Sequence, residues 1–406
     1  MAVIAETTPH AAVNDVLARR NALVLAVAQA LAGGNNTVIV STTSIVGAVL
    51  APDKGLATLP ITAMVFGMWM GTLPVGALAR RFGRRFALQT GSVFGILSGF
   101  ISYTAVLQGS FWLMVAGTFC GGLYAAAHQS YRFAAADTAS EHFRARAISY
   151  VLTGGVIAAL LGPQLVIWTK DLMPPYLFAA SFLGQSACAL LAAIVLQFVR
   201  LPQGRAVQTT ASRPLTEILR QPRFVVAAAC GMASYAMMNM VMTSAPLAMI
   251  DCGHSVTEAT LGIQWHVLAM YAPSFVTGAL IARFSVERIT ALGLGLIALT
   301  AVIAISGVSV GHFWLALMLL GAGWNFAFIG ATTMVTQCYH VHERTKVQAF
   351  NDFLIFGSMA VSSFSSGQLL ATVGWNAINE LIFPVILIAF ALLAWLKWKR
   401  RAAAAV

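Results

Sequence analysis

The stretch Gly76-Ala77-Leu78-Ala79-Arg80-Arg81-Phe82 decides the fold, because much of it returns 202 residues later as Gly278-Ala279-Leu280 and Arg283-Phe284. The same shift aligns Phe111-Trp112-Leu113 with Phe313-Trp314-Leu315, and Glu141 with Glu343. Both copies lie in strongly apolar sequence. A repeat at a fixed period indicates a duplicated structural unit. The chain is therefore predicted to contain two copies of one membrane-spanning unit.

Composition places both copies in lipid. Apolar residues make up 59% of the chain and charged residues only 9%, whereas a soluble domain carries about 25% charge. A transmembrane helix needs about 20 mostly apolar residues. Twelve stretches meet this requirement: 22–46, 59–79, 86–107, 111–131, 148–168, 176–199, 224–250, 261–282, 289–308, 313–336, 349–373 and 377–396. The predicted fold is an all-α membrane protein with two six-helix bundles.

The predicted organisation follows from these spans. A polar tail, 1–20, precedes an N-terminal bundle, 21–199, and a polar linker, 200–223, leads to a C-terminal bundle, 224–396, and a basic tail, 397–406. The first 20 residues lack the short apolar core and cleavage site of a signal peptide. Within the linker, residues 214–220 are either a short amphipathic helix at the membrane surface or part of a solvated tether.

The net charge of +11 is distributed unevenly over the connections. With both termini inside, the even-numbered connections also lie inside, and they contain most of the arginines, whereas the opposite connections hold only Lys54 and Lys170 as bases. This asymmetry is the positive-inside pattern of membrane proteins. It predicts cytoplasmic termini in a multi-pass protein of a bacterial inner membrane, and it gives no indication of nucleic-acid binding.

The loop after the second span runs from Gly76 to Arg85 as glycine, basic cluster and second glycine, and a degenerate copy surrounds Arg283. This pattern resembles the signature loop of the major facilitator superfamily. The resemblance implies two bundles related by a pseudo-two-fold axis and secondary transport by alternating access. It implies gating roles for Gly76, Arg81, Gly83, Arg84, Arg85, Asp137, Arg144 and Arg283.

One departure affects this loop. The acidic residue of the superfamily pattern falls at Arg80. Because that carboxylate is thought to brace the loop against neighbouring helices in the superfamily, the gating contact of the N-terminal half is left open. Asp137 and Asp352 are the candidates to replace it.

Aspartate, glutamate, lysine and arginine are absent from the middle of every predicted span, although Arg132 and Asp352 lie near inner ends and Glu380 lies near an outer end. A buried charge costs several kcal/mol and normally marks a functional site. The sequence therefore predicts a neutral or weakly charged solute. His128 and His266 are the candidates for proton coupling, because histidine titrates near neutral pH, and either is equally consistent with a hydrogen-bonded structural role.

In the superfamily the first, fourth, seventh and tenth spans line the central cavity. Tyr124 and His128, and likewise Tyr235 and Asn239, are four residues apart and share one helix face. The candidate solute-binding residues are Asn35, Asn36, Thr37, Tyr124, His128, Tyr235, Asn239, Gln264, Trp324 and Asn325. The alternative for each is an interhelical hydrogen bond. Aromatic groups paired with amides suit a flat, hydrogen-bonding small molecule.

Two short runs of sequence narrow the range of possible solutes. The runs Gly33-Gly34-Asn35-Asn36 and His128-Gln129-Ser130-Tyr131-Arg132-Phe133 are similar to those of riboflavin importers of this superfamily. The expectation is a monomeric secondary transporter of an organic solute, with no enzymatic activity, cofactor or metal. Two alternatives remain: an efflux antiporter for drugs or metabolites, and a non-transporting sensor or assembly partner, which only the loss of the loop carboxylate at Arg80 favours.

Overall fold

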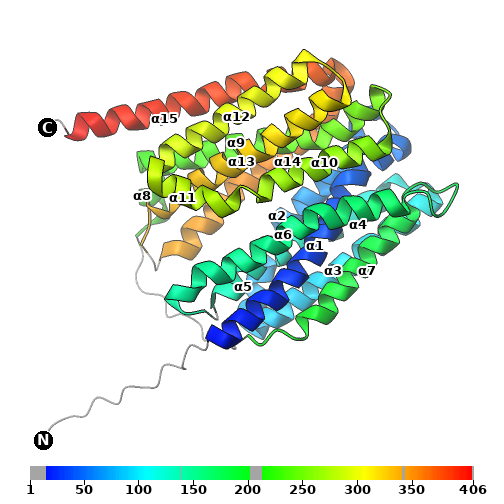
Figure 1. Ribbon diagram of the computed structural model, residues 1–406, viewed down its shortest axis with the longest axis horizontal. Helices are drawn as coiled ribbons and strands as arrows, with labels where there is room; N and C mark the ends of the chain where they lie inside the picture. The colour runs from blue at the N-terminus through cyan, green and yellow to red at the C-terminus, as the bar shows by residue number, and fades with distance from the viewer. Residues whose placement is uncertain (1–14, 138, 202–212, 341–342, 405–406) are drawn as a thin grey trace, which may run out of the picture.

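The computed structural model describes residues 15–137, 139–201, 213–340 and 343–404, and within these ranges the regular structure is entirely helical (Figure 1). The N-terminal half contains α1 (Asp15–Leu50), η1 (Lys54–Leu56), α2 (Leu59–Phe82), α3 (Arg84–Gln108), α4 (Phe111–His128), α5 (Tyr131–Asp137), α6 (Glu141–Thr169) and α7 (Ala179–Leu196). The C-terminal half follows the short helix α8 (Leu215–Leu219). It contains α9 (Pro222–Asp251), α10 (Val256–Tyr271), α11 (Ser274–Phe284), α12 (Val286–Ser306), α13 (Val310–Thr336), α14 (Arg344–Glu380) and α15 (Ile382–Ala404).

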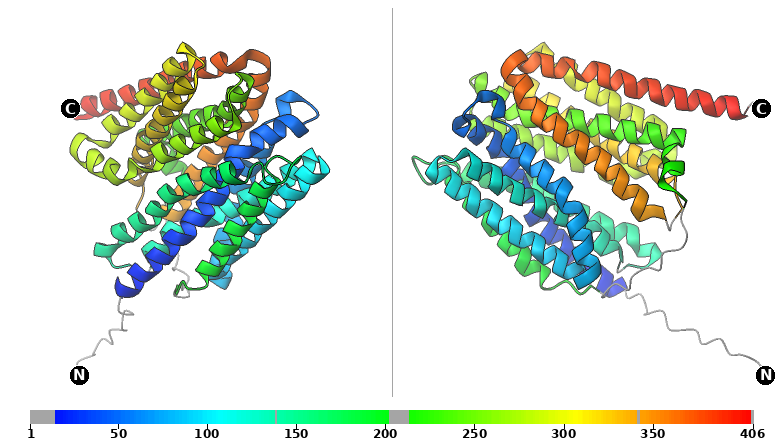
Figure 2. Two further views of the ribbon diagram at one scale, coloured as in Figure 1. Left: turned by 45° about the vertical axis from the view of Figure 1, so that its right-hand side comes forward. Right: turned by 180° about the vertical axis from the view of Figure 1, so that it is seen from behind.

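The helices account for the predicted spans. Among the described residues, 10 segments are long and apolar enough to cross a membrane, and the bent pair α10 and α11 makes 11. The segment from Lys346 to Ala402 is 57 residues long and holds two helices, α14 and α15, which form a hairpin in Figure 2. Counting that segment as two spans raises the number from 11 to the predicted twelve.

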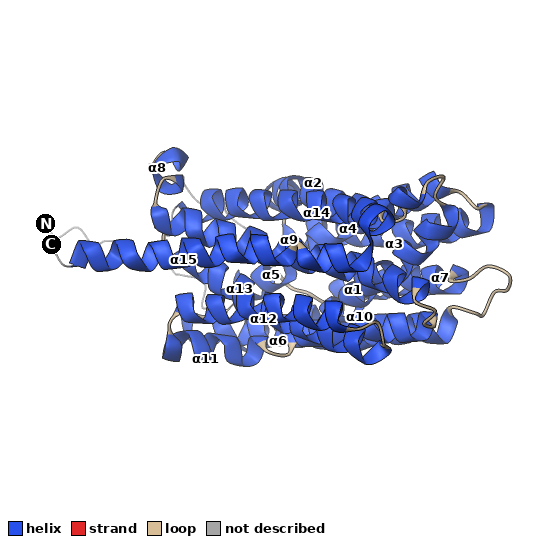
Figure 3. Ribbon diagram, turned by 90° about the horizontal axis from the view of Figure 1, so that it is seen from above, coloured by secondary structure: helices blue, strands red, loops and turns tan. Residues whose placement is uncertain are grey.

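The two halves form a V. Both ends of the described chain lie at one end of the molecule, which we name the terminal end; the other is the distal end (Figure 1). The halves meet at the distal end and diverge towards the terminal end (Figure 2). Helix pairs α2/α14 and α6/α10 make the main contacts between them. Viewed from above, α15 runs across the front of the other helices and extends beyond its neighbours at the end where N and C are marked (Figure 3).

The repeat is visible in backbone detail. Gly83 joins α2 to α3 with φ 89° and ψ 155°, and its repeat mate Ser285 joins α11 to α12 with φ 88° and ψ 151°. Positive φ suits glycine and strains serine, so the same turn is strained in the second copy and relaxed in the first. In each copy an arginine also lies over the next ring: Arg81 over Phe82 at 5.1 Å and Arg283 over Phe284 at 5.2 Å.

Two predicted spans are broken helices. The fourth span ends α4 at His128 and resumes as α5 at Tyr131, and the eighth is interrupted between Tyr271 and Ser274, with a bend of 42°. Pro273 explains the second break, because proline removes a backbone donor and clashes with the preceding turn. The predicted eighth span, 261–282, is therefore present as two helices joined at a bend.

The distal end is closed by direct contacts between the halves. Thr62 Oγ1 donates to Ser363 Oγ at 3.2 Å, and Gln164 Nε2 donates to Gln264 Oε1 at 2.8 Å. Gly367 packs so tightly that a β-carbon there would lie 2.3 Å from Thr58 Oγ1. Since these contacts join opposite halves, the distal side is shut in this conformation.

The linker is anchored to the C-terminal half. Arg213 donates from Nε and a terminal nitrogen to the Glu343 carboxylate, each at 2.8 Å, and the His340 N–H donates at 2.9 Å. The Arg213 guanidinium, together with this backbone N–H, holds the pKa of the Glu343 carboxyl well below its usual range. The following α8 buries Ile218, as expected of a short amphipathic helix.

This anchor predicts an acid-dependent loss of stability. Because the pKa of Glu343 is lower in the folded protein than in the unfolded chain, its contribution is complete above about pH 5 and declines as the pH falls further. The Glu343→Gln variant is expected to be less stable than the unaltered protein at pH 7 and to lose less of its melting temperature between pH 6 and pH 4. Glu217→Gln, at an exposed partner of Arg213, should keep the original slope, and equal slopes for all three proteins would contradict the assignment.

Candidate functional site

An aromatic cluster lies between α9, α13 and α14 of the C-terminal half. The Tyr235 ring packs edge-on against Trp324 at 5.2 Å, Phe328 at 5.0 Å and Phe356 at 6.1 Å between ring centroids. Trp324 and Phe328 are stacked, 5.0 Å apart and 13° from parallel. Tyr235 and Trp324 are each 8% exposed, whereas Phe328 and Phe356 are half-buried. The cluster therefore has an accessible edge formed by flat apolar faces.

Polar groups surround this edge from both halves. Tyr235 interacts electrostatically with Tyr271 of α10, Arg132 of α5 and Asp352 of α14. Tyr271 also lies against α6, since a β-carbon on Gly155 would be 3.3 Å from its ring. The Trp324 Nε1–H is buried without an acceptor. A flat solute here would meet aromatic faces and unused donors together.

Two charges lie near Tyr235. Arg132 and Asp352, which lie near the inner ends of their spans, are within electrostatic reach of its hydroxyl group. Their charges are opposite, so together they add no net charge. The neutral or weakly charged solute remains a prediction.

Tyr124 and His128 share a helix face as predicted, but that face points into the N-terminal half. The His128 ring lies between Tyr124, at 5.9 Å, and Tyr131, at 6.2 Å. Both tyrosines belong to the buried core of that half. Both ring nitrogens of His128 lack a hydrogen-bond partner. The described contacts therefore do not bring this pair to the aromatic cluster.

Several predicted amides tie helices together in this conformation. Asn35 Nδ2 donates to the Gln185 carbonyl of α7 at 2.9 Å, and Asn239 Nδ2 donates to the Met359 carbonyl of α14 at 3.2 Å. Thr37 bonds within its own helix, to the Gly33 carbonyl. Half-buried Asn36 keeps a buried Oδ1 without a donor. Asn36 therefore has a buried side-chain oxygen left to bond.

The candidates on α10 and α13 brace the helix break. Asn325 Nδ2 donates to the Met270 carbonyl and to Ser274 Oγ, each at 2.6 Å, while its Oδ1 accepts from Thr277. His266 Nδ1 lies 2.8 Å from the Leu317 carbonyl, which fixes Nδ1 as the protonated nitrogen because a carbonyl only accepts. These contacts assign Asn325 and His266 structural roles in this conformation.

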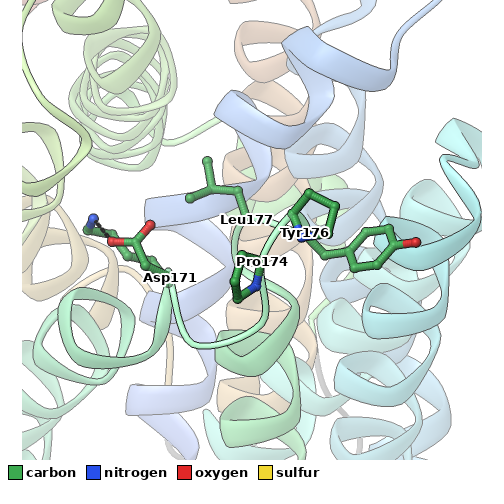
Figure 4. Close-up of a pocket in the computed structure, with 6 residues that line it drawn as sticks. Asp171, Pro174, Tyr176 and Leu177 are labelled. Carbon is green, nitrogen blue, oxygen red and sulfur yellow. Dashed lines mark hydrogen bonds and ion pairs between the residues drawn. The ribbon is translucent and has the colours of Figure 1, made fainter.

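Two cavities lie elsewhere. One, of about 110 Å³, is formed within the distal loop between α6 and α7 by Lys170, Asp171, Pro174, Pro175, Tyr176 and Leu177 (Figure 4). Another, of about 470 Å³, is an almost wholly apolar groove between α1 and α6, lined by residues such as Leu23, Val27 and Ile157. The lining residues of each cavity belong to the N-terminal half, so neither cavity is formed between the two halves.

Comparison with known proteins agrees with this architecture. The family model described as Major Facilitator Superfamily matches residues 25–263 and 227–406. The chain belongs to the Major Facilitator Superfamily. It is 51% identical over 393 residues to the riboflavin transporter RfnT of Brucella anthropi, covering 96% of this chain and 98% of that one. It is 30% identical to YddS of Bacillus subtilis, an uncharacterized MFS-type transporter, over 84% of this chain and 85% of that one.

Solved structures of the Major Facilitator Superfamily share the fold. A D-xylose–proton symporter has a TM-score of 0.72 at 16% identity, covering 92% of this chain and 97% of that one. The nucleoside transporter NupG has a TM-score of 0.71 at 13% identity, covering 93% and 99%. The chain is therefore a multi-pass membrane transporter with the MFS fold, and not an enzyme.

The MFS signature loop lies at the terminal end. Gly76 is half-buried within α2, Gly83 has the positive φ of the α2–α3 turn, and Arg85 donates to Gln197, which follows α7 directly. Arg84 starts α3, and Arg81 and Arg283 lie over their adjacent rings. The side chains of Asp137 and Arg144 lie outside the described part of the structure. Gating roles for these residues remain predictions.

Sequence reasoning missed four residues around the cluster: Phe328, Phe356, Tyr271 and Arg132. Phe328 follows Trp324 by four residues, so helical spacing could have revealed it. The charge of Arg132 could have revealed it, because a charged residue within a membrane segment normally marks a functional site. The sequence held no such signal for Tyr271 or Phe356. The position of Tyr271 depends on the break after α10, and that of Phe356 depends on how α14 packs.

Proposed function

We propose that the chain imports riboflavin across a bacterial inner membrane by alternating access. The observation that carries this proposal is the aromatic cluster of Tyr235, Trp324, Phe328 and Phe356, whose stacked faces suit a flat tricyclic ring. Identity to the riboflavin transporter of Brucella anthropi over nearly the whole chain supports it. Arg132 and Asp352 supply hydrogen-bonding groups for the carbonyls and hydroxyls of a flavin.

The proposed orientation places the terminal end in the cytoplasm. That end carries the arginines of the signature loops and the basic tail, whereas the distal connections are poor in bases. With the distal side shut, the structure corresponds to the state open to the cytoplasm. Rocking of the halves about the cluster would then expose it to the other side. We also propose that the transporter is a monomer.

The test is uptake of radiolabelled riboflavin into proteoliposomes, with empty vesicles as the control. The expected result is saturable uptake that unlabelled riboflavin inhibits and that a sugar or a nucleoside does not. Titration of the purified protein should also quench flavin fluorescence, because a stacked aromatic side chain quenches a bound flavin.

The alternatives predict other results. An efflux antiporter would release preloaded riboflavin or a hydrophobic dye only when a proton gradient opposes it. A sensor would bind flavin and show no flux in either direction. Folded protein that neither binds nor moves riboflavin would overturn the proposal.

A further inference from the structure

The apolar groove of about 470 Å³ lies between α1 and α6, which run side by side from the terminal end (Figure 1). On α6, Gly155 faces the C-terminal half, since a β-carbon there would be 3.3 Å from the Tyr271 ring. Thr153, which lines the groove, precedes Gly155 by two residues. Two residues are about 200° of helical turn, so the groove opens away from the C-terminal half and towards the surrounding membrane.

Small residues form the floor of this groove. A β-carbon on Gly154 would lie 2.2 Å from the Ala26 carbonyl oxygen, so the two helices touch there. Three larger lining side chains are half exposed: Leu23 at 49%, Val27 at 51% and Ile157 at 51%. An open apolar surface of this kind marks a place for an apolar partner.

The groove offers its occupant almost no hydrogen bonds. The Thr153 hydroxyl donates to the Ser149 carbonyl of its own helix, at 3.0 Å. Tyr150 is the other lining residue with a polar group, and its ring packs against Phe143, at 6.1 Å between centroids. From Tyr150 to Leu161 the groove runs for about 16 Å along α6, close to half of the hydrocarbon core of about 30 Å. It therefore fits one acyl chain of one leaflet.

Three arginines lie just beyond the terminal end of the groove. Arg19 and Arg20 precede the lining residue Leu23 by about one turn of α1. Arg146 precedes Tyr150 by four residues, so both lie on one face of α6. The three arginines are exposed, and they stand just outside the predicted spans that begin at 22 and 148. They therefore lie at the level of the lipid headgroups.

These positive charges are available to an anionic ligand. The Asp15 carboxylate, in the first turn of α1, accepts from the N–H and the hydroxyl of Ser140, at 3.1 and 2.8 Å. Within the described part of the chain, no carboxylate forms an ion pair with Arg19, Arg20 or Arg146. Arginine binds phosphate through paired N–H donors, and basic groups beside membrane helices attract anionic headgroups.

We propose that the groove binds an anionic phospholipid, with one acyl chain between α1 and α6 and the phosphate at Arg19, Arg20 and Arg146. A lipid that contacts both helices would hold them together and raise the stability of the folded protein. The proposal does not depend on the transported solute. The leaflet is the cytoplasmic one, and this assignment rests on the orientation proposed above.

Native mass spectrometry with added lipid tests the headgroup contact. The unaltered protein should bind one phosphatidylglycerol about tenfold or more tightly than phosphatidylcholine with the same acyl chains. The triple variant Arg19→Gln/Arg20→Gln/Arg146→Gln should lose this preference, because the phosphate no longer meets a positive charge.

The matched control removes three exposed charges from the terminal end of the C-terminal half: Arg288→Gln/Lys397→Gln/Arg401→Gln. It should keep the preference for phosphatidylglycerol. Equal affinity of the unaltered protein for both lipids, or an equal loss in both triple variants, would overturn the proposal.

Filling the groove tests the place of the acyl chain. Val27→Trp should lower the affinity for phosphatidylglycerol about tenfold or more without removing a charge, because the indole would occupy the groove. Leu299→Trp, at a 42% exposed leucine of α12, is the matched control and should bind the lipid as before. Thermal melting of both variants without added lipid shows whether each is folded.

Photochemical cross-linking locates the lipid without any substitution. Phosphatidylglycerol with a photoreactive group in one acyl chain should label peptides that contain 23–31 and 150–161, and an excess of unmodified phosphatidylglycerol should suppress this labelling. Labelling confined to other helices, or a folded Val27→Trp variant with unchanged affinity, would overturn the proposal.

Discussion

Replacing Trp324 with alanine should weaken riboflavin binding about 10- to 100-fold, which corresponds to about 1.4–2.8 kcal/mol. The indole provides one of the two stacked faces of the cluster, and it holds both Tyr235 and Phe328 in place. Truncating a central aromatic residue in a packed binding site commonly costs about 2 kcal/mol or more. Titration of purified protein, followed by flavin fluorescence, measures the loss directly.

The control separates binding from folding. Trp375 belongs to the same half, is also 8% exposed, and contacts Phe313 at 5.1 Å, a ring outside the cluster. Trp375→Ala removes the same side chain from a similarly buried place, so it should lower thermal stability while leaving the riboflavin affinity of the folded protein unchanged. Trp324→Phe should retain most of the affinity. Equal affinity losses for both alanine variants would show that the cluster is not the binding site.

The Gly367→Leu variant should lose nearly all riboflavin uptake, to less than about one tenth of the original rate. A β-carbon at this position would meet Thr58 Oγ1 at 2.3 Å and the Gly55 carbonyl at 3.0 Å, so the distal halves cannot approach as they do here. Overpacking of this kind costs about 1–3 kcal/mol. It acts on one conformation only, and therefore shifts the population towards the state with an open distal end.

Accessibility measures this shift. Position 62, where Thr62 contacts Ser363 across the closed end, can carry a cysteine for labelling with a membrane-impermeant thiol reagent. Labelling should be slow in the unaltered background and fast with Gly367→Leu. Gly295→Leu is the matched control, since a β-carbon there meets nothing closer than 4.0 Å. If uptake is lost while labelling stays slow, the substitution has damaged folding and not closure.

Much of the fold was predictable because it depends on patterns that repeat. The alignment of Gly76 with Gly278 and the twelve apolar stretches were enough to predict two bundles of six helices. The MFS signature loop then identified the superfamily. The break after Tyr271 was missed because the flanking residues are apolar on both sides, and hydropathy cannot show where Pro273 interrupts a helix.

The site was less predictable, for a physical reason. In a packed membrane bundle an inward amide such as Asn325 or Asn35 bonds to a neighbouring helix as readily as to a solute, and sequence spacing does not distinguish the two. Tyr235 and Trp324, both candidates on predicted cavity-lining spans, pack against each other in the structure, while their solute contact remains a prediction. Arg132 lies just after the break between α4 and α5, which hydropathy does not reveal.

The shut distal side has a consequence for the cell, given the orientation proposed here. An importer that rests in this shape presents its aromatic surface to the cytosol and not to the medium. Flavin already inside would occupy that surface first and delay its return to the outer face. The rate of uptake would then fall as the flavin concentration in the cytosol rises. This conformation alone would limit uptake, without a separate regulatory domain.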